Sequence, residues 1–243
     1  MFEAVQKQSV SDVVFNQLRD RIVSQQLKPG EELPAERALC ELLDVSRNAV
    51  REALKRLQQA GLVQVRHGGG TTVSDYRAQA GPELLASLMI DAAGRIQVGV
   101  ARGVVRMRQV LSPEIAADAA THGGAAIADR LDAIVQQMRA ASGAAELQPL
   151  ALEFWDVLVD GSGNIAYRLA FNSLRKTYQP IARLMTGMLA DEFSRLDSFE
   201  AMAQHVRNGA REAAFDVARD YIDSSSQAIN QFLTLYEQHL EGT

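Results

Sequence analysis

Hydrophobic residues in the first sixty positions recur with a helical period in three separate segments. The apolar positions of the first segment are Val10, Val13, Val14, Leu18 and Ile22. Ser9 or Ser11 can cap this helix, and Pro29-Gly30 interrupts the pattern after it. A second helix is expected to open at Pro34, because the fixed φ of a proline suits a first helical turn. The side chains expected on the buried side of this second helix are Leu39, Leu42 and Leu43.

The third segment, from Arg47 to about Gln59, is expected to be a helix with a buried and a solvent-facing side. Its inward residues are Val50, Leu54 and Leu57. Ser46 is placed as its N-cap, and Gly61 ends it. The hydrophobic period then changes to two over residues 62–66, a glycine-rich turn follows at 67–70, and β-branched residues fill 71–73. Three helices followed by a short hairpin predict a winged helix-turn-helix.

Small and polar residues at 76–81 predict a linker, so the expected domains are 9–75 and 82–243. Beyond the linker, every apolar stripe has a helical period. These segments are 82–91, 96–121, 125–141, 147–160, 164–190 and 197–240. Pro113 is expected to kink or split the second segment, and the last should break near Asn208-Gly209. The predicted fold class is therefore mainly α, with the winged helix-turn-helix preceding an antiparallel bundle of six or seven helices.

The charge of the chain is unevenly distributed. The whole chain carries a formal charge of -5, which argues against a nucleic-acid partner. Residues 1–78, however, hold eleven Lys and Arg against ten Asp and Glu, whereas 79–243 hold fourteen against twenty. Within 46–72 there are five basic residues and one acidic residue. A polyanion responds to such a local patch, so nucleic acid becomes a candidate partner of the first domain.

Several classes of protein and location do not fit the sequence. No run of apolar residues approaches the ~18 of a membrane span, and the N-terminus lacks a basic-then-apolar signal. The single cysteine, Cys40, lies among leucines and is interpreted as a small core residue in a reducing compartment. We therefore expect a cytoplasmic protein with no membrane partner. No nucleophile-base pattern, P-loop or Rossmann glycine pattern occurs, so no enzymatic activity is expected.

The placement of the basic residues strengthens the nucleic-acid hypothesis. Arg47, Asn48 and Arg51 fall on the first turns of the predicted third helix, whose N-terminus attracts phosphate. Arginine pairs bidentately with guanine edges and asparagine with adenine edges, while Ser46 can reach a phosphate oxygen. The alternative is a merely solvated helix face. A sequence-blind architectural DNA binder is a further class, against which the acidic second domain argues.

Residues 12–73 resemble the DNA-binding domain of the GntR family of transcriptional regulators. The segments that carry the resemblance are 33–37 (LPAER), Leu42, 45–54 (VSRNAVREAL), Leu57, 61–63 (GLV) and 67–73 (HGGGTTV). The resemblance implies that operator DNA is touched by Arg37, Ser46, Arg47, Asn48, Arg51, His67 and Gly68. On the alternative interpretation His67 is an exposed turn residue. A homodimer reading two half-sites would have a palindromic operator, with repression as the expected direction of control.

Most of residues 82–235 resemble the ligand-sensing domain of the FadR branch of this family. The matching segments are 106–116 (RMRQVLSPEIA), Ala119-Ala120, 162–164 (SGN) and Asn208-Gly209 with the following helix to Tyr221. Most of this branch holds a divalent metal with one Asp or Asn and three histidines. The corresponding positions here are Leu152, Asp156, Phe199 and Tyr221, so none of the three histidines is present. No metal and no other cofactor is therefore expected.

The substitution of metal ligands by apolar residues favours an effector with a long hydrocarbon part. The namesake FadR regulators also lack the metal set and bind long-chain acyl-CoA. Arg108, Tyr221 and Ser225 are the positions matched to their acyl-CoA contacts. Alternatively, Arg108 forms an ion pair with Glu114 or Asp118, and Tyr221 fills the core. The alternative effector is a small organic acid, with or without a divalent metal.

Overall fold

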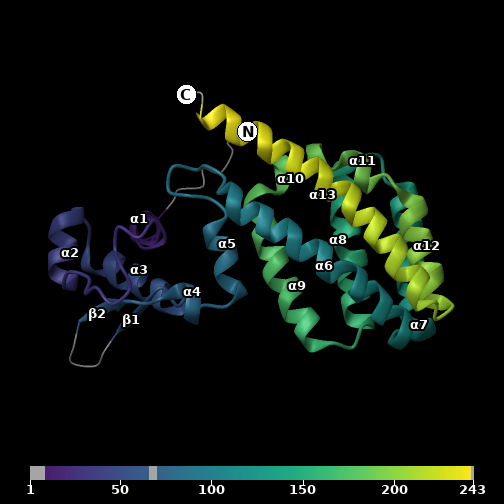
Figure 1. The fold of residues 1–243 in the computed structure, drawn as a ribbon, viewed down its shortest axis with the longest axis horizontal. Coiled ribbons are helices and arrows are strands. Elements are labelled where there is room, and N and C mark those ends of the chain that lie inside the picture. The colour runs from purple at the N-terminus through teal and green to yellow at the C-terminus, as the bar shows by residue number, and fades with distance from the viewer. Residues whose placement is uncertain (1–8, 66–69, 242–243) are drawn as a thin grey trace, which may run out of the picture. The chain divides into compact units, whose positions relative to one another are not determined.

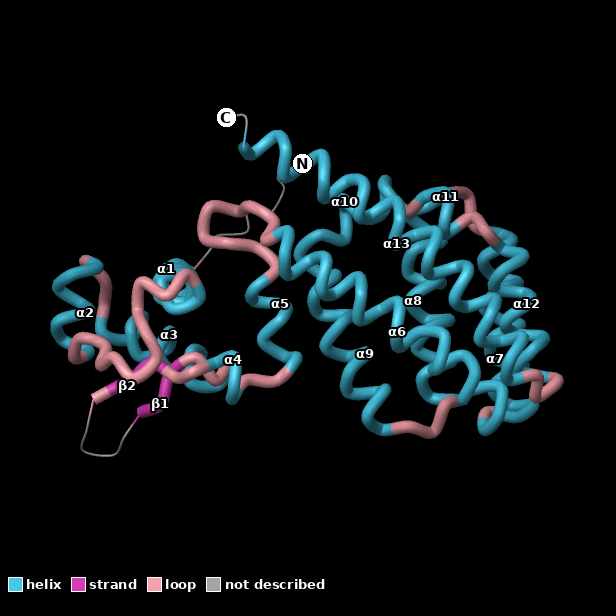
Figure 2. The backbone as a smooth tube through the Cα atoms, in the orientation of Figure 1, coloured by secondary structure: helices cyan, strands magenta, loops and turns pink. Residues whose placement is uncertain are grey.

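The computed structural model describes residues 9–65 and 70–241 and shows a mainly helical chain (Figure 1). The chain divides into two compact units, Met1–Gln97 and Val98–Thr243. Strands occur in the first unit, and the described part of the second is built from helices (Figure 2). The predicted fold class is confirmed.

The first unit is a winged helix-turn-helix. Its elements are α1 (Val10–Val23), α2 (Glu36–Leu43), α3 (Arg47–Gln59), β1 (Val63–Val65) and β2 (Thr71–Val73). The two strands are antiparallel, with Val63 opposite Val73 and Val65 opposite Thr71. Apolar side chains of the three helices and both strands form one core. Gly61, at φ +72°, adopts the left-handed conformation that ends α3, as the sequence predicts.

The helix ends show which local signals decide the fold. Ser9, the first of the two candidate caps, forms a capping box with Asp12 at the start of α1. The expected start of the second helix at Pro34 was wrong, because α2 begins at Glu36 with Ala35 as its N-cap. Before it the chain is still extended: the amide of Leu33 donates to the carbonyl of Thr71 at 2.7 Å. The segment before α2 therefore pairs with the hairpin.

Not every residue of the predicted apolar stripes is buried. In α2, Leu39 is buried, whereas Leu42 is 71% exposed. In α1, Val10 and Val13 are also exposed, while the other three apolar positions enter the core. Val10 and Val13 lie in the first turn of α1, and Leu42 lies in the last turn of the eight-residue α2.

Residues 76–97 follow the hairpin and group with the first unit. They contain α4 (Tyr76–Gln79), a 3₁₀ turn (Pro82–Leu84) and α5 (Leu85–Leu88). Leu84 is part of the winged-helix core, and Leu88 packs against it. The contact boundary therefore falls after Gln97, whereas the sequence places the linker at 76–81.

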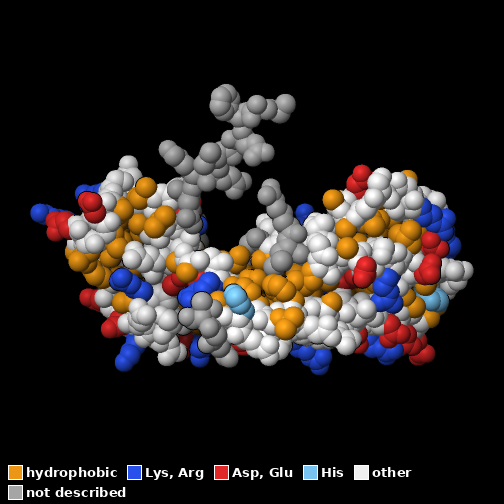
Figure 3. Space-filling model, turned by 90° about the horizontal axis from the view of Figure 1, so that it is seen from above, with side chains coloured by type: hydrophobic (Ala, Val, Ile, Leu, Met, Phe, Trp, Pro, Cys, Tyr) orange, Lys and Arg blue, Asp and Glu red, His pale blue; other side chains and the backbone are white. Residues whose placement is uncertain are grey.

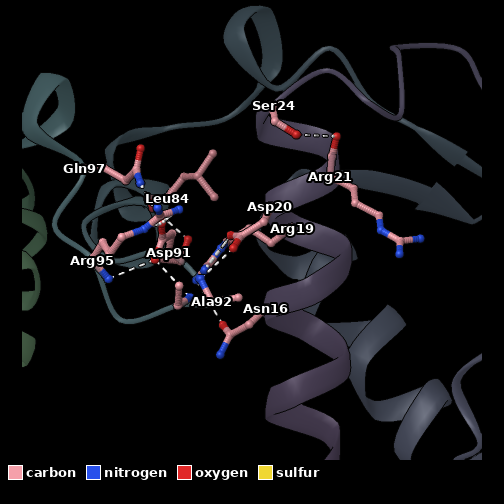
Figure 4. Close-up of polar contacts among 12 residues, drawn as sticks. Asn16, Arg19, Asp20, Arg21, Ser24, Leu84, Asp91, Ala92, Arg95 and Gln97 are labelled. Atoms are coloured by element: carbon pink, nitrogen blue, oxygen red, sulfur yellow. Dashed lines mark hydrogen bonds and ion pairs between the residues drawn. The ribbon is translucent and has the colours of Figure 1, made fainter. Parts of the chain in front are cut away.

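A polar cluster fastens the end of this segment to α1 (Figure 4). The amide of Ala92 donates to Asp20 Oδ2 at 2.6 Å, and Asp20 also accepts from the buried Arg19. Asp91 accepts hydrogen bonds from the backbone and the guanidinium of Arg95 at 2.9 Å each. Burial raises the pKa of Asp91, but the bonds from Arg95 outweigh it and hold the pKa below its usual value. The turn is thus closed by a carboxylate that stays ionised.

The second unit is a helical bundle. Its long helices are α6 (Val98–His122), α7 (Gly124–Ala140), α8 (Ala144–Gly161), α9 (Ile165–Tyr178), α12 (Leu196–Arg207) and α13 (Arg211–Glu241). Between α9 and α12 lie a 3₁₀ turn (Gln179–Ile181) and two short helices, α10 (Ala182–Met188) and α11 (Ala190–Phe193). The longest two, α6 and α13, run antiparallel and pack along each other (Figure 1).

Two sequence expectations about helix breaks have different outcomes. The break near Asn208-Gly209 is confirmed, since α12 ends at Arg207 and Gly209 has φ +64°. Pro113 does not split its segment, because α6 continues through it.

At the end of the bundle where α7 meets α12, Arg207 pairs with Asp129 and Asp132, and charged side chains of both signs gather there (Figure 3).

Candidate nucleic-acid interface and effector site

The N-terminal turns of α3 present polar side chains to solvent. The hydroxyl of Ser46 accepts a hydrogen bond from the amide of Ala49 at 3.3 Å and so caps the helix, as predicted. The inward residues, Val50, Leu54 and Leu57, are buried as the helical period predicts. On the opposite side, Ser46, Arg47, Asn48 and Arg51 are all exposed. The structure thus brings four of the seven predicted DNA contacts onto one accessible surface.

Acidic residues of α2 lie next to these arginines. Glu36 Oε2 is 3.6 Å from Arg47 Nε, and Glu36 Oε1 is 3.9 Å from Arg51 Nε. Arg37 pairs with Glu41 within α2 and is the most exposed of these arginines. Because all the arginine side chains are well exposed, each pair is worth at most about 1 kcal/mol. The carboxylates therefore orient the arginines and compete only weakly with a phosphate for them.

A groove separates α3 from the hairpin. Its lining residues are Asn48, Arg51, Glu52, Leu54, Lys55 and Gln58 from α3, Glu36 from α2, and Val65 and Thr71 from the strands. The hairpin thus continues the polar surface of α3, as a wing does. The two wing-tip residues of the predicted contact set, His67 and Gly68, lie outside the described residues.

Arg56 fixes the position of α3 on α1. Its guanidinium bonds to Asp12 Oδ1 at 2.5 Å and lies 4.4 Å from the centre of the Phe15 ring. Hydrogen bonds from Ser9 and Arg56 lower the pKa of Asp12 below its usual value. The cap of α1 and the packing of α3 therefore share one carboxylate.

In the second unit, Arg108 on α6 pairs with Glu192 on α11. Arg108 Nη2 is 2.7 Å from Glu192 Oε1, and the Glu192 residue is only 6% exposed. Its other oxygen, Oε2, is buried and has no hydrogen-bond partner. The alternative interpretation, an ion pair of Arg108 with Glu114 or Asp118, is wrong in its partner, because those two carboxylates pair with Arg211 and Arg108 pairs with Glu192. The role of Arg108 toward an effector stays a prediction.

Tyr221 and Ser225, the other two predicted effector contacts, are both buried on α13. The ring of Tyr221 lies 5.0 Å from that of Phe199 and 6.3 Å from that of Trp155. Burial raises the pKa of Tyr221 well above its usual value, and the negative charge of Glu192 adds to the shift. The hydroxyl of Ser225 donates to the carbonyl of Ile222 in its own helix. Tyr221 therefore lies beside the Arg108–Glu192 pair, whereas the Ser225 hydroxyl is already engaged.

The positions matched to the family's metal ligands have other contacts here. Phe199 packs edge-to-face on Tyr221 and on Phe154, at 5.0 and 4.9 Å between ring centres. Asp156 pairs with Arg168 and Arg175, and Leu152 is half-buried. Among the residues that the structure describes, no three His, Cys, Asp or Glu side chains are grouped as a metal site. The residues present do not fit the family's metal set.

A second polar group lies between α8 and the α9–α10 connection. Gln148 donates to the carbonyl of Ala182 at 3.1 Å and to the hydroxyl of Tyr178, and it accepts from Thr186 Oγ1 at 2.8 Å. Burial raises the pKa of Tyr178 above its usual value. Neither this group nor Glu192 was found from the sequence, since single polar residues in an apolar helical stripe give no distinguishing signal.

Comparison with known proteins agrees with the geometry of both units. The family model described as "Bacterial regulatory proteins, gntR family" matches residues 10–73, and the model "FCD domain" matches 104–224. The HTH-type transcriptional regulator Mce2R of Mycobacterium tuberculosis (strain CDC 1551 / Oshkosh) is 34% identical over 93% of this chain and 94% of its own. The fatty acid metabolism regulator protein of Cronobacter sakazakii is 25% identical over 89% of each.

A solved structure shows the same fold. It is a GntR-family transcriptional regulator from Pseudomonas syringae pv. tomato, with a TM-score of 0.50 and 19% identity. It covers 96% of this chain and 89% of its own. None of the helices in the described part of the chain is long and apolar enough to cross a membrane. The chain belongs to the GntR family of bacterial transcriptional regulators, with a winged helix-turn-helix DNA-binding domain followed by an FCD effector-binding domain.

Proposed function

We propose that this protein is a homodimeric repressor that binds a palindromic operator in the cytoplasm and releases it on binding a fatty acyl-CoA. The observation that carries the DNA part is the exposed N-terminal face of α3, with Arg47, Asn48 and Arg51 opposite a buried apolar face. These side chains are suited to base edges, while Ser46 can reach a phosphate. Arg37 is a further DNA contact, and the wing residues His67 and Gly68 would enter the minor groove. Two copies would place two such helices in successive major grooves.

The DNA assignment is tested by fluorescence anisotropy with an operator found by selection from random duplexes. Replacing Arg47 or Arg51 by alanine is expected to weaken operator binding by about 5- to 150-fold, since a good bidentate base contact contributes ~1–3 kcal/mol. Arg21→Ala removes an exposed arginine of the same unit that is not on α3 and serves as the control. Binding that is unchanged in both α3 variants, or insensitive to salt, would refute the assignment.

The effector assignment rests on the contents of the FCD domain. Phe199 and Tyr221 occupy two of the family's metal positions, and Arg108 supplies a cation beside this aromatic pair. Such an arrangement suits a ligand with an anionic head and a hydrocarbon chain, and relatives named fatty acid metabolism regulator support this class. Effector binding would change the distance between the two α3 helices only if the two states differ in effector affinity.

Native mass spectrometry of the protein isolated from its own host tests the effector class. A bound mass that corresponds to an acyl-CoA, together with weaker operator binding in the presence of palmitoyl-CoA, is expected. A co-purified small organic acid, with or without a divalent metal, would favour the alternative effector. A stoichiometric metal would refute the interpretation of Leu152, Phe199 and Tyr221 as substituted ligand positions.

Gel-shift titration and a reporter gene test the mode of control. If the protein is a repressor, its deletion is expected to raise expression from the promoter that carries the operator. A stoichiometry of one chain per operator would contradict the homodimer.

A further inference from the structure

The pair between Arg108 and Glu192 joins a long helix to a very short one. Arg108 lies in α6, which has twenty-five residues, whereas Glu192 lies in α11, which has four. The Arg108 side chain is 27% exposed, and that of Glu192 is 5% exposed. The cation is therefore partly accessible, while the anion that neutralises it is enclosed.

Glu192 is incompletely satisfied in this position. One carboxylate oxygen accepts from Arg108, and the other is buried without a hydrogen-bond partner. A buried charge with an unmatched acceptor is costly, so this carboxylate is held in the interior by Arg108 and by the neighbouring Tyr221. An incoming anion that pairs with Arg108 would deprive the buried Glu192 carboxylate of its ion pair and so favour its exposure to solvent.

Exposed residues and a second arginine lie close to Glu192. Asp191, Ser194 and Arg195 are exposed and Phe193 is buried, so bringing Glu192 to solvent takes a rotation of about 100° or the unwinding of this four-residue helix. The Arg195 guanidinium lies 5.9 Å from the centre of the Tyr221 ring, close to the present pair, and can receive the released carboxylate. Because α11 contacts both α13 and α8, a movement of α11 would be transmitted to these two helices.

We propose that Glu192 is an internal stand-in for the effector's anionic group, which displaces it from Arg108 and releases α11. This inference rests on the proposed effector site but holds for a phosphate-bearing acyl-CoA and for a small carboxylate alike. It identifies Glu192 as a residue that sets effector affinity through Arg108. Binding of an uncharged analogue would leave the pair and α11 in place.

The test compares the full-length wild type with Glu192→Gln and Asp191→Asn. Glutamine keeps the shape of the side chain but no longer competes as an anion, so palmitoyl-CoA is expected to bind about tenfold more tightly by calorimetry. Asp191→Asn makes the same charge change one residue earlier, on an exposed side chain, and is expected to stay within about twofold of wild type. Glu192→Asp, which keeps the charge but shortens its reach, provides a milder second variant should Glu192→Gln fold poorly.

Hydrogen exchange measured by mass spectrometry supplies a second readout. Amides of residues 189–195 are expected to exchange faster in wild type with palmitoyl-CoA than without it, and faster in ligand-free Glu192→Gln than in Asp191→Asn. Unchanged affinity in the Glu192 variants, or added protection of 189–195 on binding, would overturn the inference and leave the proposed effector standing. If wild type binds no palmitoyl-CoA, the acyl-CoA assignment fails instead. In that case calorimetry with glutarate, a small carboxylate, and the hydrogen exchange of the ligand-free variants test whether Glu192 competes with an anion for Arg108.

Discussion

Replacing Phe199 by alanine is expected to destabilise the FCD domain by about 3–5 kcal/mol. The side chain is fully buried, and its ring meets Phe154 of α8 and Tyr221 of α13 edge-to-face. Both neighbours are rigid rings on separate helices, so they cannot collapse into the space that the substitution leaves. Each lost aromatic pair contributes about 0.5–1.5 kcal/mol of this total.

The single tryptophan makes the change measurable in the FCD domain alone. Trp155 lies on α8 with its ring 6.3 Å from that of Tyr221, so its fluorescence follows unfolding of this core. At about 2–4 °C per kcal/mol for a domain of this size, the midpoint of thermal unfolding should fall by about 6–20 °C. Phe215→Ala, on the same helix as Tyr221 but half-buried, is the control and should cost about 1 kcal/mol. An effect of Phe199→Ala no larger than the control would refute the packed aromatic centre.

Two further predictions concern carboxylates of the first unit. Asp12→Asn is expected to lower the free energy of unfolding by about 1 kcal/mol at neutral pH. Because the pKa of Asp12 is lowered in the folded state, this difference from wild type should persist above about pH 4 and vanish in stronger acid. Urea titrations at several pH values, followed by circular dichroism, measure it. Asp91→Asn should lower the free energy of local opening of this turn by about 1–3 kcal/mol, with the same sign of pH dependence. Hydrogen exchange at the amides of Ala93 and Arg95, which donate to Asp91, measures this change. Equal exchange in wild type and variant would contradict the role given to Asp91.

The elements that the sequence predicts best are those on which several local signals agree. The third helix was expected from Arg47 to about Gln59, and α3 has these bounds because cap, apolar period and terminating glycine all indicate the same segment. The hairpin follows from the change of period at Gly61. Where only one local signal was present, at Pro34, the start of the helix was wrong by two residues, since pairing of the preceding segment with β2 is not a local property.

The candidate effector site could be predicted only in part for the same reason. Arg108 was found through its place in a recognisable motif, but its partner Glu192 is far away in sequence. The nearer carboxylates, Glu114 and Asp118, were the plausible partners on helical spacing and instead pair with Arg211. A contact between residues on different helices depends on how the bundle packs, which periodicity within each helix does not determine.

The proximity of Glu36 to Arg47 and Arg51 has a consequence for how the protein finds its operator in a genome. A random stretch of duplex offers the two arginines only phosphates, which must compete with a carboxylate already beside them. Dwell times at the millions of competing sites are thereby shortened, since nonspecific affinity is almost wholly electrostatic. A matching sequence adds contacts to base edges, which Glu36 cannot imitate. If Arg47 and Arg51 contact DNA as proposed, Glu36 therefore shortens non-specific encounters, and only the added base contacts of the operator give a long residence.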